Sequence, residues 1–173
     1  MKFSLEKSIH ILDRTPAVLK TLLRNLPEDW TAPNEGPDTW SPYDVVGHLI
    51  HGEKTDWIPR ARIILEQGEK QPFTPFDRFA QFEESKGKTL NQLLDEFESH
   101  RTDNIKTLES LNISQADLTK TGIHPEFGAV TLENLLAAWV VHDLGHIYQI
   151  SRVMAKQYTN EVGPWSQYMG VLK

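Results

Sequence analysis

Residues 132–156 read LENLLAAWVVHDLGHIYQISRVMAK, and this stretch carries the clearest helical pattern in the chain. Its apolar side chains recur at intervals of three and four residues, so they fall on one face of an α-helix. Thr131 stands directly before the pattern and can cap the first turn through its hydroxyl. The stretch therefore predicts one long helix that buries a single face against other helices.

Three earlier segments show the same period, so the chain as a whole predicts four long helices. The first covers about residues 4–26. The pair Thr15-Pro16 should either kink this helix or restart it, with Thr15 as the N-cap and Pro16 in the first helical position.

The second and third helices have strong start signals. Ser41 can serve as the N-cap of the second, which should run to about residue 68 with a kink at Pro59. Thr89 can cap the third helix, and Gln92 three residues later completes a capping box.

The connections between these helices are long. We expect them to be irregular, with almost no strand, including the stretch 112–130 that contains Gly122 and Pro125. The tail after residue 156 should fold back on the helices or cover a partner. We therefore predict an all-α protein, a four-helix bundle with long irregular connections, formed by residues 1–173 as one domain.

The composition of the chain argues against several classes of partner and of reactive site. The chain has 173 residues, a formal net charge of −6 and no cysteine. The acidic balance argues against nucleic acid and against a polybasic membrane anchor as partners. The absence of cysteine excludes disulfides, thiolate metal sites and cysteine nucleophiles. The N-terminus is too charged for a signal peptide and no apolar stretch is long enough to span a membrane, so we expect a cytoplasmic protein.

The candidate chemistry lies in the histidines. His142 and His146 are four residues apart on the last helix, which places two imidazoles one turn apart as a chelating pair. On a helical wheel both border the apolar face. Asp143 falls near the centre of that face, where a carboxylate must be paired. It either belongs to a buried ion pair or orients a metal-bound imidazole.

The second helix offers His48 and His51, three residues apart. The wheel does not choose between them, and the pattern alone favours a surface or rim position for each. Glu53 falls near the apolar centre of this helix and is a second carboxylate that we expect to be buried.

Two blocks of the sequence resemble the signatures of the DinB-like superfamily of damage-inducible, metal-binding proteins. The first is Trp40-Ser41-Pro42 followed by residues 44–49 (DVVGHL) and Glu53, and the second is residues 142–146 (HDLGH). The likeness extends over about residues 5–155 and implies a four-helix bundle. It also implies that one histidine of the second helix and the later pair bind a divalent metal. The implied ligands are His48, His142 and His146, with His48 preferred over His51 because it occupies the Gly-His-Leu position.

The remaining candidates surround these ligands. Asp143 and Glu53 are the carboxylates that could orient the imidazoles or serve as a general base. His51 and His124 are candidates for the pocket rim, and His10 and His100 are expected on the surface.

Three neutral imidazoles leave a metal with open coordination positions, which is typical of catalytic sites. Nitrogen ligands suit zinc or nickel, the metals that we favour. The expected function is a metal-dependent hydrolase acting on a small molecule. One alternative is a metal-assisted, thiol-dependent S-transferase that uses a low-molecular-weight thiol, with Arg60 and Arg62 as the nearest cations. Another is a non-catalytic stress-response protein stabilised by metal. The apolar tail makes a homodimer conceivable, through Trp165, Tyr168, Met169 and Val171.

Overall fold

Side-chain caps fix the start of three long helices in the computed structural model, which describes residues 2–173. The hydroxyls of Ser41, Thr89 and Thr131 each accept a hydrogen bond from the backbone N–H of the third helical residue. The side chain of that residue in turn accepts a hydrogen bond from the backbone N–H of the capping residue, which completes a capping box. These caps open the helices α4 (Pro42–Thr55), α7 (Leu90–Ser110) and α8 (Leu132–Lys156). The predicted starts are confirmed, and α8 has the predicted bounds at both ends.

The first helical segment restarts as the Thr15-Pro16 pair predicts, but not through the predicted cap. It consists of α1 (Leu5–Leu12) and α2 (Thr15–Leu23). Thr15 is the first residue of α2, and its hydroxyl donates to the carbonyl of Ile11 at 3.2 Å. The N-cap is Arg14, which makes no side-chain cap, so the expected role of Thr15 was wrong.

The second helical segment breaks one turn before its proline. After α4 ends at Thr55, α5 (Trp57–Glu66) begins beyond Asp56. Pro59 has no N–H to donate to the carbonyl of Thr55, four residues earlier, and its ring crowds that carbonyl. The predicted disturbance is therefore present, and it appears as a break at Asp56.

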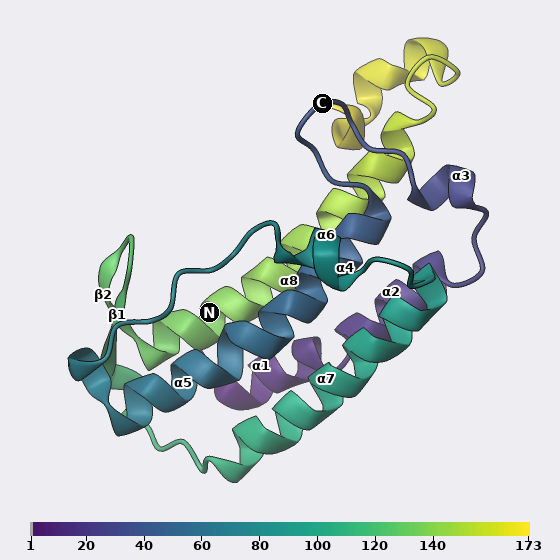
Figure 1. The fold of residues 1–173 in the computed structure, drawn as a ribbon. Coiled ribbons are helices and arrows are strands. Elements are labelled where there is room, and N and C mark those ends of the chain that lie inside the picture. Colours follow the sequence, from purple (N-terminus) through teal and green to yellow (C-terminus); the bar gives the residue numbers. More distant parts are fainter. Residues whose placement is uncertain (1) are drawn as a thin grey trace.

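The long helices form four rods: α1 with α2, α4 with α5, α7, and α8 (Figure 1). The first rod packs against α7 and α8, and the second rod also packs against both. The first two rods therefore occupy opposite corners of a four-helix bundle, as do α7 and α8. Because consecutive rods at opposite corners are joined across an end of the bundle, two of the connections must be long. This confirms the predicted fold class.

The connections hold short elements that the sequence pattern did not predict. A hairpin of β1 (Thr121–His124) and β2 (Gly128–Thr131) replaces part of the irregular stretch expected at 112–130. Its antiparallel register runs from Thr121 opposite Thr131 to His124 opposite Gly128. Gly128 ends the tight turn with φ 72°, a value that favours glycine. The other short elements are α3 (Glu28–Thr31), η1 (Gly68–Lys70), α6 (Ala80–Glu84) and η2 (Asp117–Thr119).

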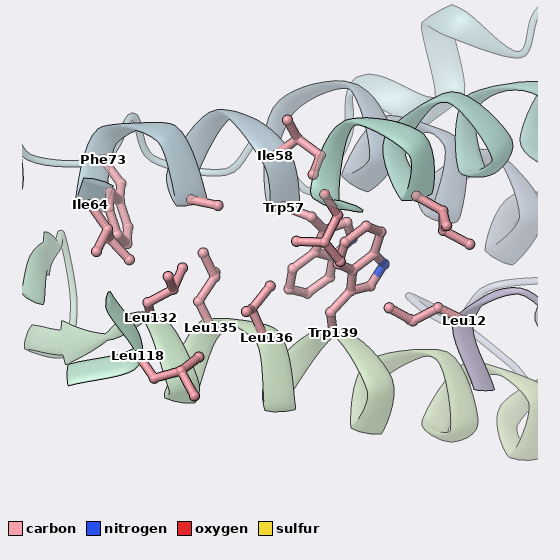
Figure 2. Close-up of a cluster of buried hydrophobic side chains, with 13 residues drawn as sticks. Leu12, Trp57, Ile58, Ile64, Phe73, Leu118, Leu132, Leu135, Leu136 and Trp139 are labelled. Atoms are coloured by element: carbon pink, nitrogen blue, oxygen red, sulfur yellow. The ribbon is translucent and has the colours of Figure 1, made fainter. Parts of the chain in front are cut away.

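Two apolar clusters fill the bundle. The first lies mainly between α5 and the N-terminal half of α8, where Figure 2 shows Trp57 and Trp139 face to face. Their rings are 5.6 Å apart and nearly parallel. The second cluster joins α2, α4 and α7 with Ile150 of α8. The buried guanidinium of Arg101 lies between the two clusters, over the ring of Trp139 in the first and the ring of Phe97 in the second.

The tail contains two short turns, η3 (Gly163–Tyr168) and η4 (Gly170–Leu172). η4 packs against α8, so the tail folds back on the C-terminal part of that helix (Figure 1), while Trp165 and Tyr168 stay largely exposed. Within residues 2–173, every helix is too short or too polar to cross a membrane.

Candidate metal centre

Three histidines from two rods converge on one point. His48 lies on α4, and His142 and His146 lie one turn apart on α8. The Nε2 atom of His142 is 3.0 Å from Nε2 of His48 and 3.1 Å from Nε2 of His146. One ligand atom from each of the three lies within 4.8 Å of the other two. The structure therefore brings together the three residues that the resemblance implied as ligands.

Burial keeps these imidazoles neutral. Burial first, and the neighbouring histidines second, lower the pKa of His48 to about 3 and that of His142 to about 2. Burial also lowers the pKa of His146. Neutral imidazole is the form that binds a metal, so the site is ready for a cation at neutral pH.

Surrounding side chains orient the rings. The Nδ1 atom of His146 donates to Oε1 of Gln149 at 2.8 Å, which leaves the lone pair of His146 Nε2 directed at the other histidines. The ring of Trp40 stacks on the ring of His146 and makes a tilted contact with the ring of His48. The rings of Trp57 and His142 form a T-shaped pair with a centroid distance of 5.1 Å. The pattern alone favoured a surface or rim position for His48; that is wrong, since the residue is buried.

The donor set fits a divalent transition metal. Two nitrogens bound to one metal ion at about 2.0–2.1 Å lie roughly 3.3–3.4 Å apart in a tetrahedral site and about 2.9 Å apart across a right angle. The two separations that involve His142, 3.0 and 3.1 Å, lie between these values, and the third pair lies within 4.8 Å. Facing nitrogens of neutral imidazoles can share at most one proton per pair, whereas a cation satisfies all three lone pairs at once. Nitrogen donors alone do not distinguish zinc from nickel.

A pocket of about 690 Å³ opens beside the histidines. The side chains of Trp40 and Phe76 form apolar walls, and the hairpin turn from His124 to Phe127 closes another side. One side of the pocket is formed by the second rod, where residues four apart in the sequence share one face. This row consists of His48, Gly52, Asp56 and Arg60, all of which line the pocket.

Asp143 and Glu53 are buried as predicted, but they bind an arginine and not the histidines. The guanidinium of Arg101 on α7 donates to both carboxylate oxygens of Asp143, at 2.6 and 3.1 Å. It also donates to Glu53 at 2.8 Å and to the carbonyl of Leu12 at 2.8 Å. The sequence left two interpretations of Asp143, and the structure shows the buried ion pair. The suggestion that these carboxylates orient the imidazoles is not supported.

Glu53 has two further partners that hold it inside the bundle. Trp139 Nε1 donates to one of its carboxylate oxygens, and Asn104 donates to the other. Neither Glu53 nor Asp143 lines the pocket, so the general-base role considered for them is replaced by a structural one.

The other predicted histidines lie in different surroundings. His124 lines the pocket as expected, with its ring stacked on Phe127 at 4.3 Å. His51 does not line it: this histidine is buried, and its Nδ1 lies 2.9 Å from Oε1 of Glu84 on α6. The surface position that the pattern favoured for His51 is therefore wrong, and His51 contacts the pocket only through the ring of Phe76. His10 is exposed and His100 is partly exposed.

The two arginines considered as cations beside the site, Arg60 and Arg62, also lie in different places. Arg60 is buried in the pocket, where it pairs with Asp56 at 2.8 Å. Arg62 is exposed and lies outside the pocket. Sequence reasoning missed Asp56 and Arg78, both of which line the pocket. The spacing of four from His48 through Asp56 to Arg60 could have revealed Asp56, whereas Arg78 lies in a connection without periodicity.

Fold and site together define a four-helix bundle with a candidate three-histidine metal centre. The profile of the DinB superfamily matches residues 11–150, and the chain belongs to this superfamily. Among solved structures, the chain is similar to YfiT from Bacillus subtilis, with a TM-score of 0.76, 23% identity and 90% of each chain covered. That protein is described as a probable metal-dependent hydrolase with an unusual four-helix bundle topology. No curated protein matches the chain significantly.

Proposed function

We propose that this protein is a metal-dependent hydrolase of a small molecule, with His48, His142 and His146 holding one divalent ion. The convergence of three neutral Nε2 atoms beside an open pocket carries this proposal. The description of YfiT as a probable metal-dependent hydrolase agrees with it. Three protein ligands leave positions open for water and substrate, in contrast to closed structural sites. Zinc and nickel are the ions that we propose.

A divalent ion, when bound, supplies a Lewis acid that polarises a carbonyl and makes water more acidic. The protein supplies the surroundings. Trp40 and Phe76 shield one side of the site from solvent. Gln149 holds the ring of His146 in the tautomer whose Nε2 carries the lone pair.

Asp56 is the carboxyl group that we assign to proton transfer. It lines the same pocket as the histidines, and Arg60 holds it at 2.8 Å. Burial raises the pKa of Asp56 above its ordinary value, with Arg60 opposing this effect. A carboxylate with a raised pKa is a better proton acceptor near neutral pH.

The first test is elemental analysis of protein purified without chelator, followed by hydrolysis assays on small esters and amides. We expect about one transition-metal ion per chain and turnover that disappears on chelation. Asp56→Asn should lower turnover by about 10²-fold or more while the metal content stays unchanged. Asp103→Asn, exposed on α7, is the matched control and should retain turnover.

Two outcomes would replace the proposal. Turnover that appears only with an added low-molecular-weight thiol would identify an S-transferase. Full metal content, no turnover with or without thiol and a large fall in Tm on chelation would identify a binding protein stabilised by its metal.

A further inference from the structure

Two arginines line the pocket beside the histidines, and only one of them is already occupied. Arg60 pairs with Asp56, and its Nη2 donates to the carbonyl of Thr74 at 3.2 Å. Arg78 is exposed, and the ion pairs formed within residues 2–173 leave it without a partner. A guanidinium with no internal role at the mouth of a pocket is available to a ligand.

The segment that carries Arg78 is anchored across the site. In Figure 1 it runs from the hairpin along the bundle to α6. Phe73 is buried, and its N–H donates to the carbonyl of Ile123 in β1 at 2.9 Å. The ring of Phe76 packs on His48 and on His51, at centroid distances of 5.3 and 4.9 Å. These two anchors hold the segment beside the pocket, which Pro75, Phe76 and Arg78 line.

Arg78 lines the same pocket as His48, His142 and His146. Its guanidinium and the three imidazoles therefore border one shared space. Two acids also line the pocket. Asp56 is paired with Arg60, and Glu126 is exposed at the hairpin turn on the other side.

The charges therefore favour an anion. The three imidazoles are neutral, so a bound divalent ion keeps its full positive charge, and the two arginines balance only the two acids. The pocket with its metal is electropositive by about two charges on this count. Arg78 is the member of the set that can reorient toward an incoming ligand.

We propose that the small molecule bound in this pocket carries a carboxylate, and that Arg78 binds this carboxylate while another group of the molecule faces the three histidines. This inference rests on the proposed function, because it assumes a metal with open positions. Arginine matches the planar, two-oxygen shape of a carboxylate. Trp40, Phe76 and Phe127 then pack against the rest of the molecule.

The test compares two probes that differ only at the far end. One is the monohydroxamate of succinic acid, and the other is its counterpart with a terminal amide in place of the carboxylate. The hydroxamate group chelates metals, and binding to zinc-loaded protein is followed by calorimetry. We expect the carboxylate probe to bind about fivefold to tenfold tighter than the amide. The difference should shrink as salt is raised.

Arg78→Gln should shrink the difference between the two probes, since only the charge of the metal then favours the carboxylate, whereas Arg62→Gln should preserve the difference in full. Arg62 is the matched control, because it is also exposed and unpaired within residues 2–173 but lies outside the pocket. Equal affinities in the unchanged protein, or a preference that survives undiminished in Arg78→Gln, would overturn the inference and leave the metal site standing. If neither hydroxamate binds a fully zinc-loaded protein, the open metal site is wrong, and the inference falls with the proposed function.

Discussion

Arg101→Ala should destabilise the protein by about 3–5 kcal/mol, the usual cost of removing one partner from a buried ion pair. The structure supports the upper part of this range. Arg101 is 1% exposed and donates four hydrogen bonds: two to Asp143, one to Glu53 and one to the Leu12 carbonyl. Burial alone would lower the pKa of Arg101, but the two carboxylates raise it above its ordinary value. The guanidinium therefore stays charged, and its loss leaves two buried carboxylates facing each other.

The loss of the Arg101 guanidinium affects the two carboxylates to different extents. Glu53 keeps its hydrogen bonds from Asn104 and Trp139, whereas Asp143 loses every hydrogen bond that its carboxylate makes within residues 2–173. The stability should be measured by urea unfolding in the presence of chelator, so that changes in metal affinity do not contribute. For a chain of this length, the loss corresponds to a fall in Tm of roughly 6–20 °C.

Two comparisons make the measurement specific. Arg62→Ala removes an exposed arginine and should change stability by less than about 0.5 kcal/mol. The double variant Arg101→Ala with Asp143→Ala should cost less than the sum of the two single changes, by about 0.5–3 kcal/mol. A cost for Arg101→Ala below about 1 kcal/mol, or additive costs in the double variant, would refute the view that Arg101 compensates the buried charges of Asp143 and Glu53.

Three further predictions concern the histidines. In metal-free protein, stability should fall as pH drops from about 6.5 toward 3, because the unfolded chain takes up protons that buried His48 and His142, with their pKa values of about 3 and 2, do not. At pH 5 this costs about 2 kcal/mol per histidine, and urea unfolding that is unchanged between pH 7 and pH 5 would contradict it. Free zinc at 1,000 times its Kd should add about 4 kcal/mol and raise Tm by roughly 8–16 °C, and a calorimetric scan without that rise would argue against binding to the folded state. Elemental analysis should separate two groups of alanine variants. Metal should be lost in the variants of His48, His142 and His146, and kept in those of His10, His51 and His100. Metal retained in His48→Ala but lost in His51→Ala would show that the wrong histidine of α4 was chosen.

Local signals explain why the helices were predictable. A cap and a helical period act within a few residues, so Ser41, Thr89 and Thr131 could be identified without knowing their neighbours in space. The hairpin at 121–131 was missed because its strands are only four residues long, and its turn combines Pro125 with Gly128. A short loop with a glycine between two brief strands is typical of a hairpin, but so brief an alternation is easily taken for a loop.

The packing of α6 on α4 is an example of information that periodicity does not hold. A Cβ atom on Gly47 would come within 2.5 Å of the Ser85 hydroxyl, so the glycine before His48 permits this close approach. His51 is buried for the same reason, since α6 covers it and supplies Glu84. A helical wheel treats a helix as if one face met the core, and it fails where a connection covers a second face.

The site itself was predictable to different depths. The spacing of His142 and His146 indicated a chelating pair directly, whereas the choice of His48 needed the resemblance to a family. Asp143 and Glu53 were recognised as buried charges, but their partner was not. Arg101 lies four residues from Phe97 and from Ile105, both in the core, so a cation stood on the apolar stripe of its helix too.

Three charged residues on three apolar stripes must find one another, because none of them can be buried alone. Their meeting point explains where the histidines sit. Asp143 follows His142 directly on α8, and Glu53 lies five residues after His48 on α4, so Arg101 links the same portions of the two rods that carry the candidate ligands. The Nε2 atoms of His48 and His142 are 3.0 Å apart, and a shift of one helical residue along either rod would move them by about 1.5 Å. Replacing a whole buried charge cluster by apolar residues often costs little net stability, but a slipped arrangement of this one would leave its charges unpaired, so we infer that it selects the register of the rods. The ion cluster therefore fixes the alignment on which a three-histidine metal centre depends.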